Sequence, residues 1–164
     1  MKRRVSYLGM FLALALVFSY VENLIPFFFG VPGMKLGLTN AVILLVLYTL
    51  GTRDAYIISV LRVLLAGFLF GNAFSIIYSL AGGLLSLTVM CILKRTGKLH
   101  LITISVCGGI FHNLGQMIVA VFVVENLYLF GYFPFLFIGG GLTGLLIGVV
   151  AFEMLKRTRH IFKS

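Results

Sequence analysis

The sequence predicts an all-α integral membrane protein: one domain, residues 1–164, folded as a bundle of six transmembrane helices. Apolar residues make up 61% of the chain and charged residues only 10%, whereas a soluble domain carries about 25% charged residues. A chain of 164 residues keeps too large a surface to bury that apolar excess in one soluble core. Its cations also stand in short clusters between apolar runs, as topology signals do. We therefore expect lipid to cover much of the outside.

Long uncharged runs define the helices. A bilayer core about 30 Å thick needs about 20 apolar residues in helical form. Four runs approach or reach that length: residues 5–21, 73–93, 101–124 and 135–152. Two shorter runs, residues 36–51 and 55–70, give helices of about 24 Å at a rise of ~1.5 Å per residue. A tight turn at Thr52-Arg53-Asp54 is expected between these two.

Charge places both chain ends in the cytosol. With six helices and a cytosolic N-terminus, all 13 lysines and arginines except Lys35 and Arg62 fall on the cytosolic side, which is the positive-inside pattern. A five-helix alternative fuses residues 55–93 through Gly71-Asn72 and moves three cations outside, so six helices are favoured. The sequence thus predicts a multi-pass protein of the cell membrane with cytoplasmic N- and C-termini.

Several function classes are disfavoured. The net charge of +9 comes from cations between apolar runs, not from cations along a groove with exposed aromatic residues, so no nucleic-acid partner is expected. Cys91 and Cys107 lack metal-type spacing, so no metal site is expected. The chain has no P-loop, no G-x-S-x-G elbow and no HExxH motif. We predict neither an enzyme nor a resident cofactor.

Arg62 is the most informative polar residue. It lies midway along the third predicted helix, where an arginine costs at least about 2.5–3.5 kcal/mol on insertion scales. Its side chain must face the bundle interior, a partner or an anionic ligand, or else extend to the interface. Two main interpretations stay open. One is an internal pair with Glu22, Glu125 or helix carbonyls, and the other is a contact with a ligand.

A second polar cluster lies in the fifth predicted helix. His112 and Gln116 are four residues apart and share one face, and Asn113 lies a little over a quarter-turn round. Hydrogen bonds between helices, the polar wall of a binding cavity and proton relay by His112 all stay open. The other predicted site residues are Glu22, Lys35, Asn40, Asn72, Tyr78 and Ser79. Together they predict an outward-facing pocket with a cationic bias, suited to an anionic or polar-aromatic small molecule.

Two further patterns concern loops and helix packing. The outer loop, residues 22–35, contains Pro, Gly and three consecutive Phe, which fits either an aromatic anchor or a lid over a cavity. Small residues recur at four-residue spacing, which favours close helix packing in lipid. The stripes are Gly9 and Ala13; Gly67 and Gly71; Ser75, Ser79 and Gly83; Gly140, Gly144 and Gly148. Gly9 and Ala13 fit partner docking as an alternative.

Four segments, in this order, resemble a bacterial membrane family. They are residues 31–40 (VPGMKLGLTN), 61–65 (LRVLL), 78–83 (YSLAGG) and 112–116 (HNLGQ). The family is the Gx transporter family, also called heptaprenyl diphosphate synthase component I. It is similar to the S components of energy-coupling-factor (ECF) vitamin transporters, six-helix proteins whose outer loop caps a small-molecule site. The resemblance implies docking on a T component driven by two ATPases, which Gly9 and Ala13 fit only partly, because the typical pattern uses two alanines.

The resemblance implies three functions. The favoured one is a transporter component that binds an anionic or polar-aromatic solute, similar to a vitamin or cofactor. The second is a membrane subunit of a flavin- or quinone-linked electron-transfer system, beside an extracellular flavin-binding protein. The third is a non-catalytic partner of a prenyl diphosphate synthase. Catalysis of prenyl transfer by this chain is not expected, because such enzymes hold magnesium with several carboxylates, and Asp54 is the only aspartate.

Overall fold

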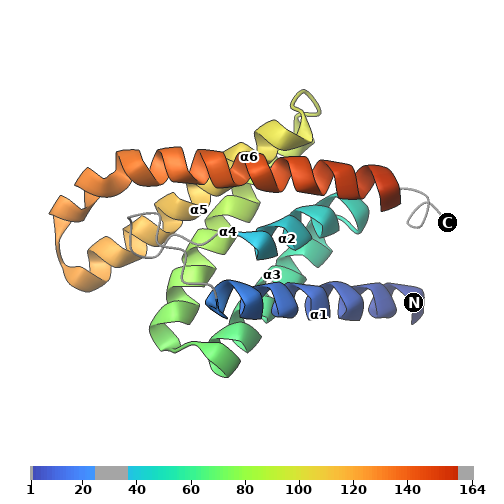
Figure 1. The fold of residues 1–164 in the computed structure, drawn as a ribbon, viewed down its shortest axis with the longest axis horizontal. Coiled ribbons are helices and arrows are strands. Elements are labelled where there is room, and N and C mark those ends of the chain that lie inside the picture. Colours follow the sequence, from blue (N-terminus) through green and yellow to red (C-terminus); the bar gives the residue numbers. More distant parts are fainter. Residues whose placement is uncertain (1, 25–36, 159–164) are drawn as a thin grey trace.

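The computed structural model describes residues 2–24 and 37–158, and within these ranges all regular structure is helical. Figure 1 shows the arrangement. In chain order the helices are α1 (Lys2–Leu24), α2 (Leu38–Thr49), α3 (Thr52–Phe70), α4 (Ala73–Arg95), α5 (Leu101–Val124), the short 3-10 helix η1 (Leu127–Tyr132) and α6 (Phe133–Thr158). The all-α class and the six α-helices are therefore confirmed for the described part of the chain.

Four helical stretches are long and apolar enough to cross a membrane: Arg4–Leu24, Ala73–Arg95, Leu101–Val124 and Leu127–Thr158, the last of which joins η1 to α6. The 12 residues of α2 are too few for a full crossing, because a helix rises ~1.5 Å per residue. The structure thus supports a membrane protein. The count of six spans and the cytosolic placement of the ends remain predictions.

Two predicted boundaries were wrong. The turn expected at Thr52-Arg53-Asp54 is instead the first turn of α3, because Gly51 takes the positive φ of 106° needed to reverse the chain after α2. Asp54 then lies where the helix dipole favours an acidic residue. The outer loop expected from Glu22 begins later, because α1 continues to Leu24. Most of that predicted loop, residues 25–36, lies outside the described residues.

The predicted break at Gly71-Asn72, which distinguishes six helices from five, is confirmed, because α3 ends at Phe70 and α4 begins at Ala73. Gly71 ends α3, and the side-chain oxygen of Asn72 accepts a hydrogen bond of 2.8 Å from the backbone N–H of Ser75. This is N-terminal capping, which satisfies a backbone donor that would otherwise lack a partner. The 3-10 helix η1 was not expected. It follows Glu125, which takes a left-handed φ of 53°, and its first turn is capped by Asn126.

Glycines set the packing of α5 against its neighbours. A Cβ at Gly144 would lie 2.6 Å from the carbonyl oxygen of Ser105, and one at Gly148 would lie 3.0 Å from the α-carbon of Ile102. On the α4 side, a Cβ at Gly115 would lie 2.7 Å from the oxygen of Ala81. Only glycine permits such approaches. Helix packing is therefore confirmed as the role of the Gly140, Gly144 and Gly148 stripe.

The shortest α-helix forms the centre of the bundle. α2 lies between α1, α3 and α6 (Figure 1), and its residues 41–47 are all buried. Val42, Leu44, Val46 and Leu47 are completely inaccessible. Because α2 is apolar on every side, it is stabilised by burial against its neighbours rather than by an amphipathic face.

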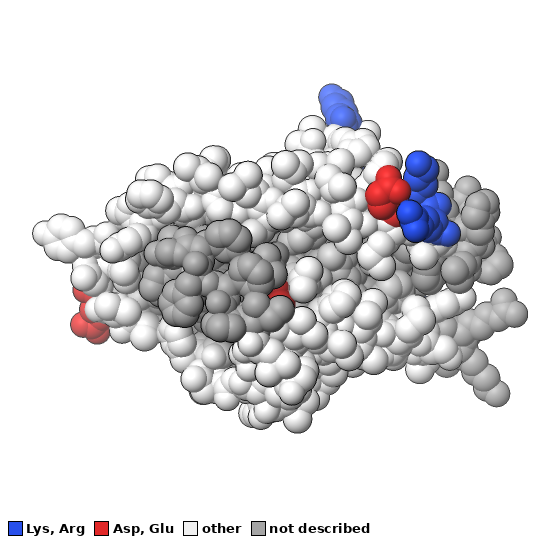
Figure 2. All heavy atoms as spheres, viewed as in Figure 1, with Lys and Arg blue, Asp and Glu red and all other residues white. Residues whose placement is uncertain are grey.

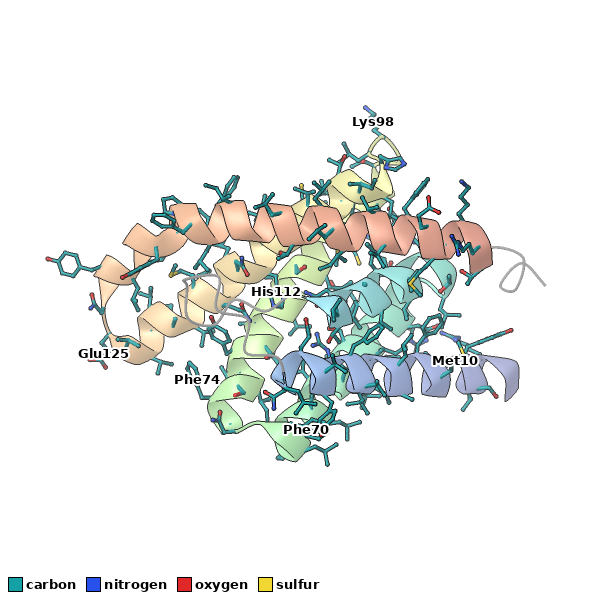
Figure 3. All side chains as sticks on the ribbon, in the orientation of Figure 1. Met10, Phe70, Phe74, Lys98, His112 and Glu125 are labelled. Atoms are coloured by element: carbon teal, nitrogen blue, oxygen red, sulfur yellow. The ribbon has the colours of Figure 1, made fainter. Side chains whose placement is uncertain are left out.

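Charged residues concentrate at one end of the molecule. The first residues of α1 and the last of α6 lie at the same end (Figure 1), and in Figure 2 described Lys and Arg side chains gather toward it. Glu125 lies toward the opposite end (Figure 3). Arg4 pairs with the buried Asp54 across 2.6 Å and 3.1 Å. Lys94 donates to the carbonyl of Leu47 at 2.5 Å, which satisfies a group at the end of α2.

Candidate functional site

A polar cavity of about 380 Å³ lies inside the bundle, and residues from all six α-helices line it. Its lining residues come from the C-terminal ends of α1 and α3, from the N-terminal ends of α2 and α4, and from the middle of α5 and α6. The cavity therefore lies near the middle of the two long helices α5 and α6, away from the end where the chain termini lie (Figure 1). Its volume falls within the range of small-molecule sites, about 300–1,000 Å³.

Most predicted site residues meet at this cavity. The lining includes Glu22, Asn40, Arg62, Asn72, Ser79, His112, Asn113 and Gln116. His112 appears at the centre of the bundle in Figure 3. Tyr78 does not line the cavity, because its ring stacks beside Phe74 with centroids 5.6 Å apart. Lys35 lies outside the described residues. The structure brings the polar residues of distant helices together, and their contact with a substrate stays a prediction.

Arg62 lies on the inward face of α3. That face recurs with helical period through Ile58, Ser59, Arg62, Val63 and Gly67, all of them buried. The arginine is only 9% exposed, and it lines the cavity. Within residues 2–24 and 37–158, its Nε and Nη2 atoms have no hydrogen-bond partner. The guanidinium group, with five N–H donors, therefore lies at the cavity with donors on Nε and Nη2 that make no hydrogen bond to a described residue.

Glu22 has a different role from the internal counter-ion considered above. One carboxylate oxygen accepts the backbone N–H of Leu38 at 2.7 Å, and the other accepts the hydroxyl of Thr39 at 2.8 Å. Gly37 precedes α2 and has no side chain to cap it, so Glu22 caps this helix from α1. Among the described residues the one ion pair is Arg4–Asp54, and Glu22 acts on Arg62 only as a nearby charge.

The neutral polar residues fall into two groups. Some are occupied by structural hydrogen bonds: Asn72 caps α4, and the Asn113 Nδ2 donates to the carbonyl of Leu136 on α6 at 2.8 Å. The side chains of Asn40, Ser79 and Gln116 have no recorded hydrogen bond to any described residue, although they line the cavity. The second group is thus available to a solute or to water.

Replacing Asn113 with leucine is expected to lower stability by about 0.6–1.7 kcal/mol, because hydrogen bonds between membrane helices contribute amounts in that range. Gln116→Leu, one turn along α5, is the matched control and should leave stability unchanged or raise it, because no described group is left without its partner. Thermal unfolding of both variants in the same detergent checks the difference. An equal loss of stability in both would contradict the assignment.

Sequence reasoning missed several lining residues. Ser19, Asn23 and Thr143 contribute polar groups to the cavity. Ser19 precedes Glu22 by three residues, so the helical spacing that united His112 and Gln116 also indicates that Ser19 and Glu22 share a face of α1. Thr143 gave no such signal. Its hydroxyl donates to the carbonyl of Gly139 at 3.0 Å, as any threonine in a membrane helix can.

Comparison with known proteins supplies the family. A family model for heptaprenyl diphosphate synthase component I matches residues 11–154, which include every lining residue of the cavity. The chain belongs to this family. No curated protein and no solved structure matches it. The family resemblance carried by the four sequence segments is thereby confirmed, and the likeness to ECF S components stays a prediction. Among the described residues of this component I protein, no group of three or more His, Cys, Asp or Glu could hold a metal ion.

Proposed function

We propose that this component I family member is a solute-binding membrane component of a transporter. The observation that supports it is the polar cavity that all six α-helices enclose around Arg62. Polar groups inside a membrane bundle are costly unless they meet each other, water or a ligand. Here the side chains of Arg62, Asn40 and Gln116 line a space large enough for a small molecule and keep unused donors or acceptors.

Transport through such a component needs an energy source, and we propose that an ECF-type T component with its ATPases supplies it. Gly9 and Ala13 lie on an exposed face of α1, and a Cβ at Gly9 would meet nothing within 4 Å. That open small-residue surface suits the close approach of another helix. On this proposal both residues dock the partner, as the sequence predicted.

The test is native mass spectrometry of detergent-purified protein, with an absorbance scan of the same sample. We expect a non-lipid small molecule at a stoichiometry near one in the wild type. Ser79→Phe, which fills the cavity from α4, should remove it, whereas Ile77→Phe, on the exposed side of the same helix, should not. Equal occupancy in both variants, or no solute in any sample, would contradict the proposal.

The family name favours a second candidate, a non-catalytic membrane partner of a prenyl diphosphate synthase. That function predicts co-purification with a soluble synthase and a fall in synthase activity when this chain is deleted. The electron-transfer alternative predicts a flavin or quinone in the same purified sample. Mass spectrometry and the absorbance scan separate it from the transport proposal, because a retained solute that is neither a flavin nor a quinone counts against electron transfer.

A further inference from the structure

We infer that the cavity recognises a small monoanion, with its carboxylate paired to Arg62 and its neutral polar groups facing Asn40, Ser79 and Gln116. This inference rests on the proposed function and adds the charge and polarity of the solute. The sequence predicted either an anionic or a polar-aromatic solute, and this inference favours the anionic solute.

The state of Arg62 supplies the first argument. Its guanidinium remains charged under all ordinary conditions, so burial cannot be relieved by loss of a proton. It is only 9% exposed, and its Nε and Nη2 atoms have no partner in the described part of the chain. Nε and a terminal nitrogen form the edge that carboxylate and phosphate oxygens bind with two parallel hydrogen bonds. An oxyanion satisfies both atoms at once.

The charges around the cavity set the charge of the solute. Arg62 and Glu22 are the charged side chains among the described lining residues, if His112 is counted as neutral. The carboxylate of Glu22 is occupied by the N-terminal groups of α2, where the helix dipole already balances part of its charge. Glu22 acts on Arg62 as a nearby charge but makes no hydrogen bond to it, so Nε and Nη2 stay unpaired among the described residues. One oxyanion pairs with both atoms, whereas a dianion such as a diphosphate brings a further negative charge beside Glu22.

The neutral groups argue for a polar solute. Asn40 and Gln116 each carry donors and an acceptor, and Ser79 carries a hydroxyl. These side chains have no recorded hydrogen bond to any described residue. A site of this kind rejects analogues that lack matching groups, because its own buried polar groups then stay unpaired. A fatty acid or an isoprenoid diphosphate, with a long apolar chain, fits it poorly.

The test compares three probes of similar size that share a ring and a hydroxyl and carry a negative, a neutral or a positive group in the para position: 4-hydroxybenzoate, 4-hydroxybenzamide and 4-hydroxybenzylamine. Thermal unfolding of the full-length protein is followed by a thiol-reactive dye in a Cys107→Ser background, where the signal comes from the buried Cys91. At millimolar concentration, we expect the carboxylate to raise the Tm of this protein and to bind at least tenfold more tightly than the amide or the amine.

Variants on one helix locate the effect. Arg62→Gln should abolish the Tm shift caused by the carboxylate. Arg62→Lys should retain part of it, because lysine keeps the positive charge but cannot donate two parallel hydrogen bonds from a planar group. Arg53→Gln, an exposed arginine on α3 outside the cavity, should respond like wild type. Arg62→Gln is expected to fold, because Nε and Nη2 have no described hydrogen-bond partner to leave behind.

The inference is overturned if the amide or amine stabilises as well as the carboxylate, if the carboxylate stabilises Arg62→Gln as much as wild type, or if no carboxylate effect appears at all. A neutral or cationic solute found in the purified protein also overturns it, but that result leaves the proposed function standing. Conversely, a carboxylate effect that depends on Arg62 supports the anion site even where the purified protein retains no solute, a result that counts against the proposed transport function alone.

Discussion

Replacing Gly140 with alanine is expected to destabilise the protein by about 1–3 kcal/mol, the usual cost of forcing extra volume into a packed core. A Cβ at this position would lie 2.7 Å from the carbonyl oxygen of Gly109 and 2.9 Å from the Nδ2 of Asn113. Because the first contact is with backbone, no side-chain rotation can relieve it, and α5 and α6 must move apart. The same movement would lengthen the hydrogen bond from Asn113 to α6.

The adjacent residue provides the control. A Cβ at Gly141 would meet nothing within 4 Å, so Gly141→Ala adds the same methyl group to the same helix without a collision. Alanine is the better helix former, so this variant should match or exceed the wild type. Thermal unfolding of both variants in one detergent measures the contrast. If the two alanines have the same effect, the close approach of α5 and α6 at Gly140 is not a determinant of stability.

The helices were predictable because membrane insertion leaves strong marks in a sequence. Run length and the clustering of cations located the start of α1, the end of α3, both ends of α4 and the start of α5 to within a few residues. The end of α6 lies further from its predicted position, at Thr158 rather than residue 152. The failures were local. Residue types alone do not distinguish Gly51 from Thr52-Arg53-Asp54 as the turn after α2, since both carry turn-forming residues. The positive φ of Gly51 decided it.

Many of the polar residues that line the cavity were predictable, but which of them are already hydrogen-bonded within the protein was not. An arginine inside a membrane helix avoids lipid, so the bundle interior was one of the places expected for Arg62, and there it lines the cavity. Which polar groups are already used depends on helix register. The hydrogen bond from Asn113 to Leu136 and the cap that Glu22 provides for α2 join residues of different helices. Only Asn72, a local cap three residues before Ser75, carried a signal in the sequence itself.

Removing the carboxylate of Glu22 is the second substitution with a large expected effect. Glu22→Ala should lower the free energy of unfolding by about 1–3 kcal/mol, because it leaves the N–H of Leu38 and the hydroxyl of Thr39 without a charged acceptor. Glu22→Gln keeps an acceptor without the charge and should fall between alanine and wild type. Glu153→Ala, an exposed glutamate of α6, is the control and should be nearly neutral. Thermal unfolding of the three variants gives the comparison.

A double-mutant cycle then separates capping from ion pairing. If Glu22 serves α2, as its two hydrogen bonds indicate, the effects of Glu22→Gln and Arg62→Gln on stability should add to within about 0.5 kcal/mol. A pair of counter-ions predicts the opposite: each single substitution would leave a buried charge alone, and the second would recover much of the loss. Strong coupling would mean that Arg62 is neutralised within the protein. Additivity would leave its charge available to an anionic solute.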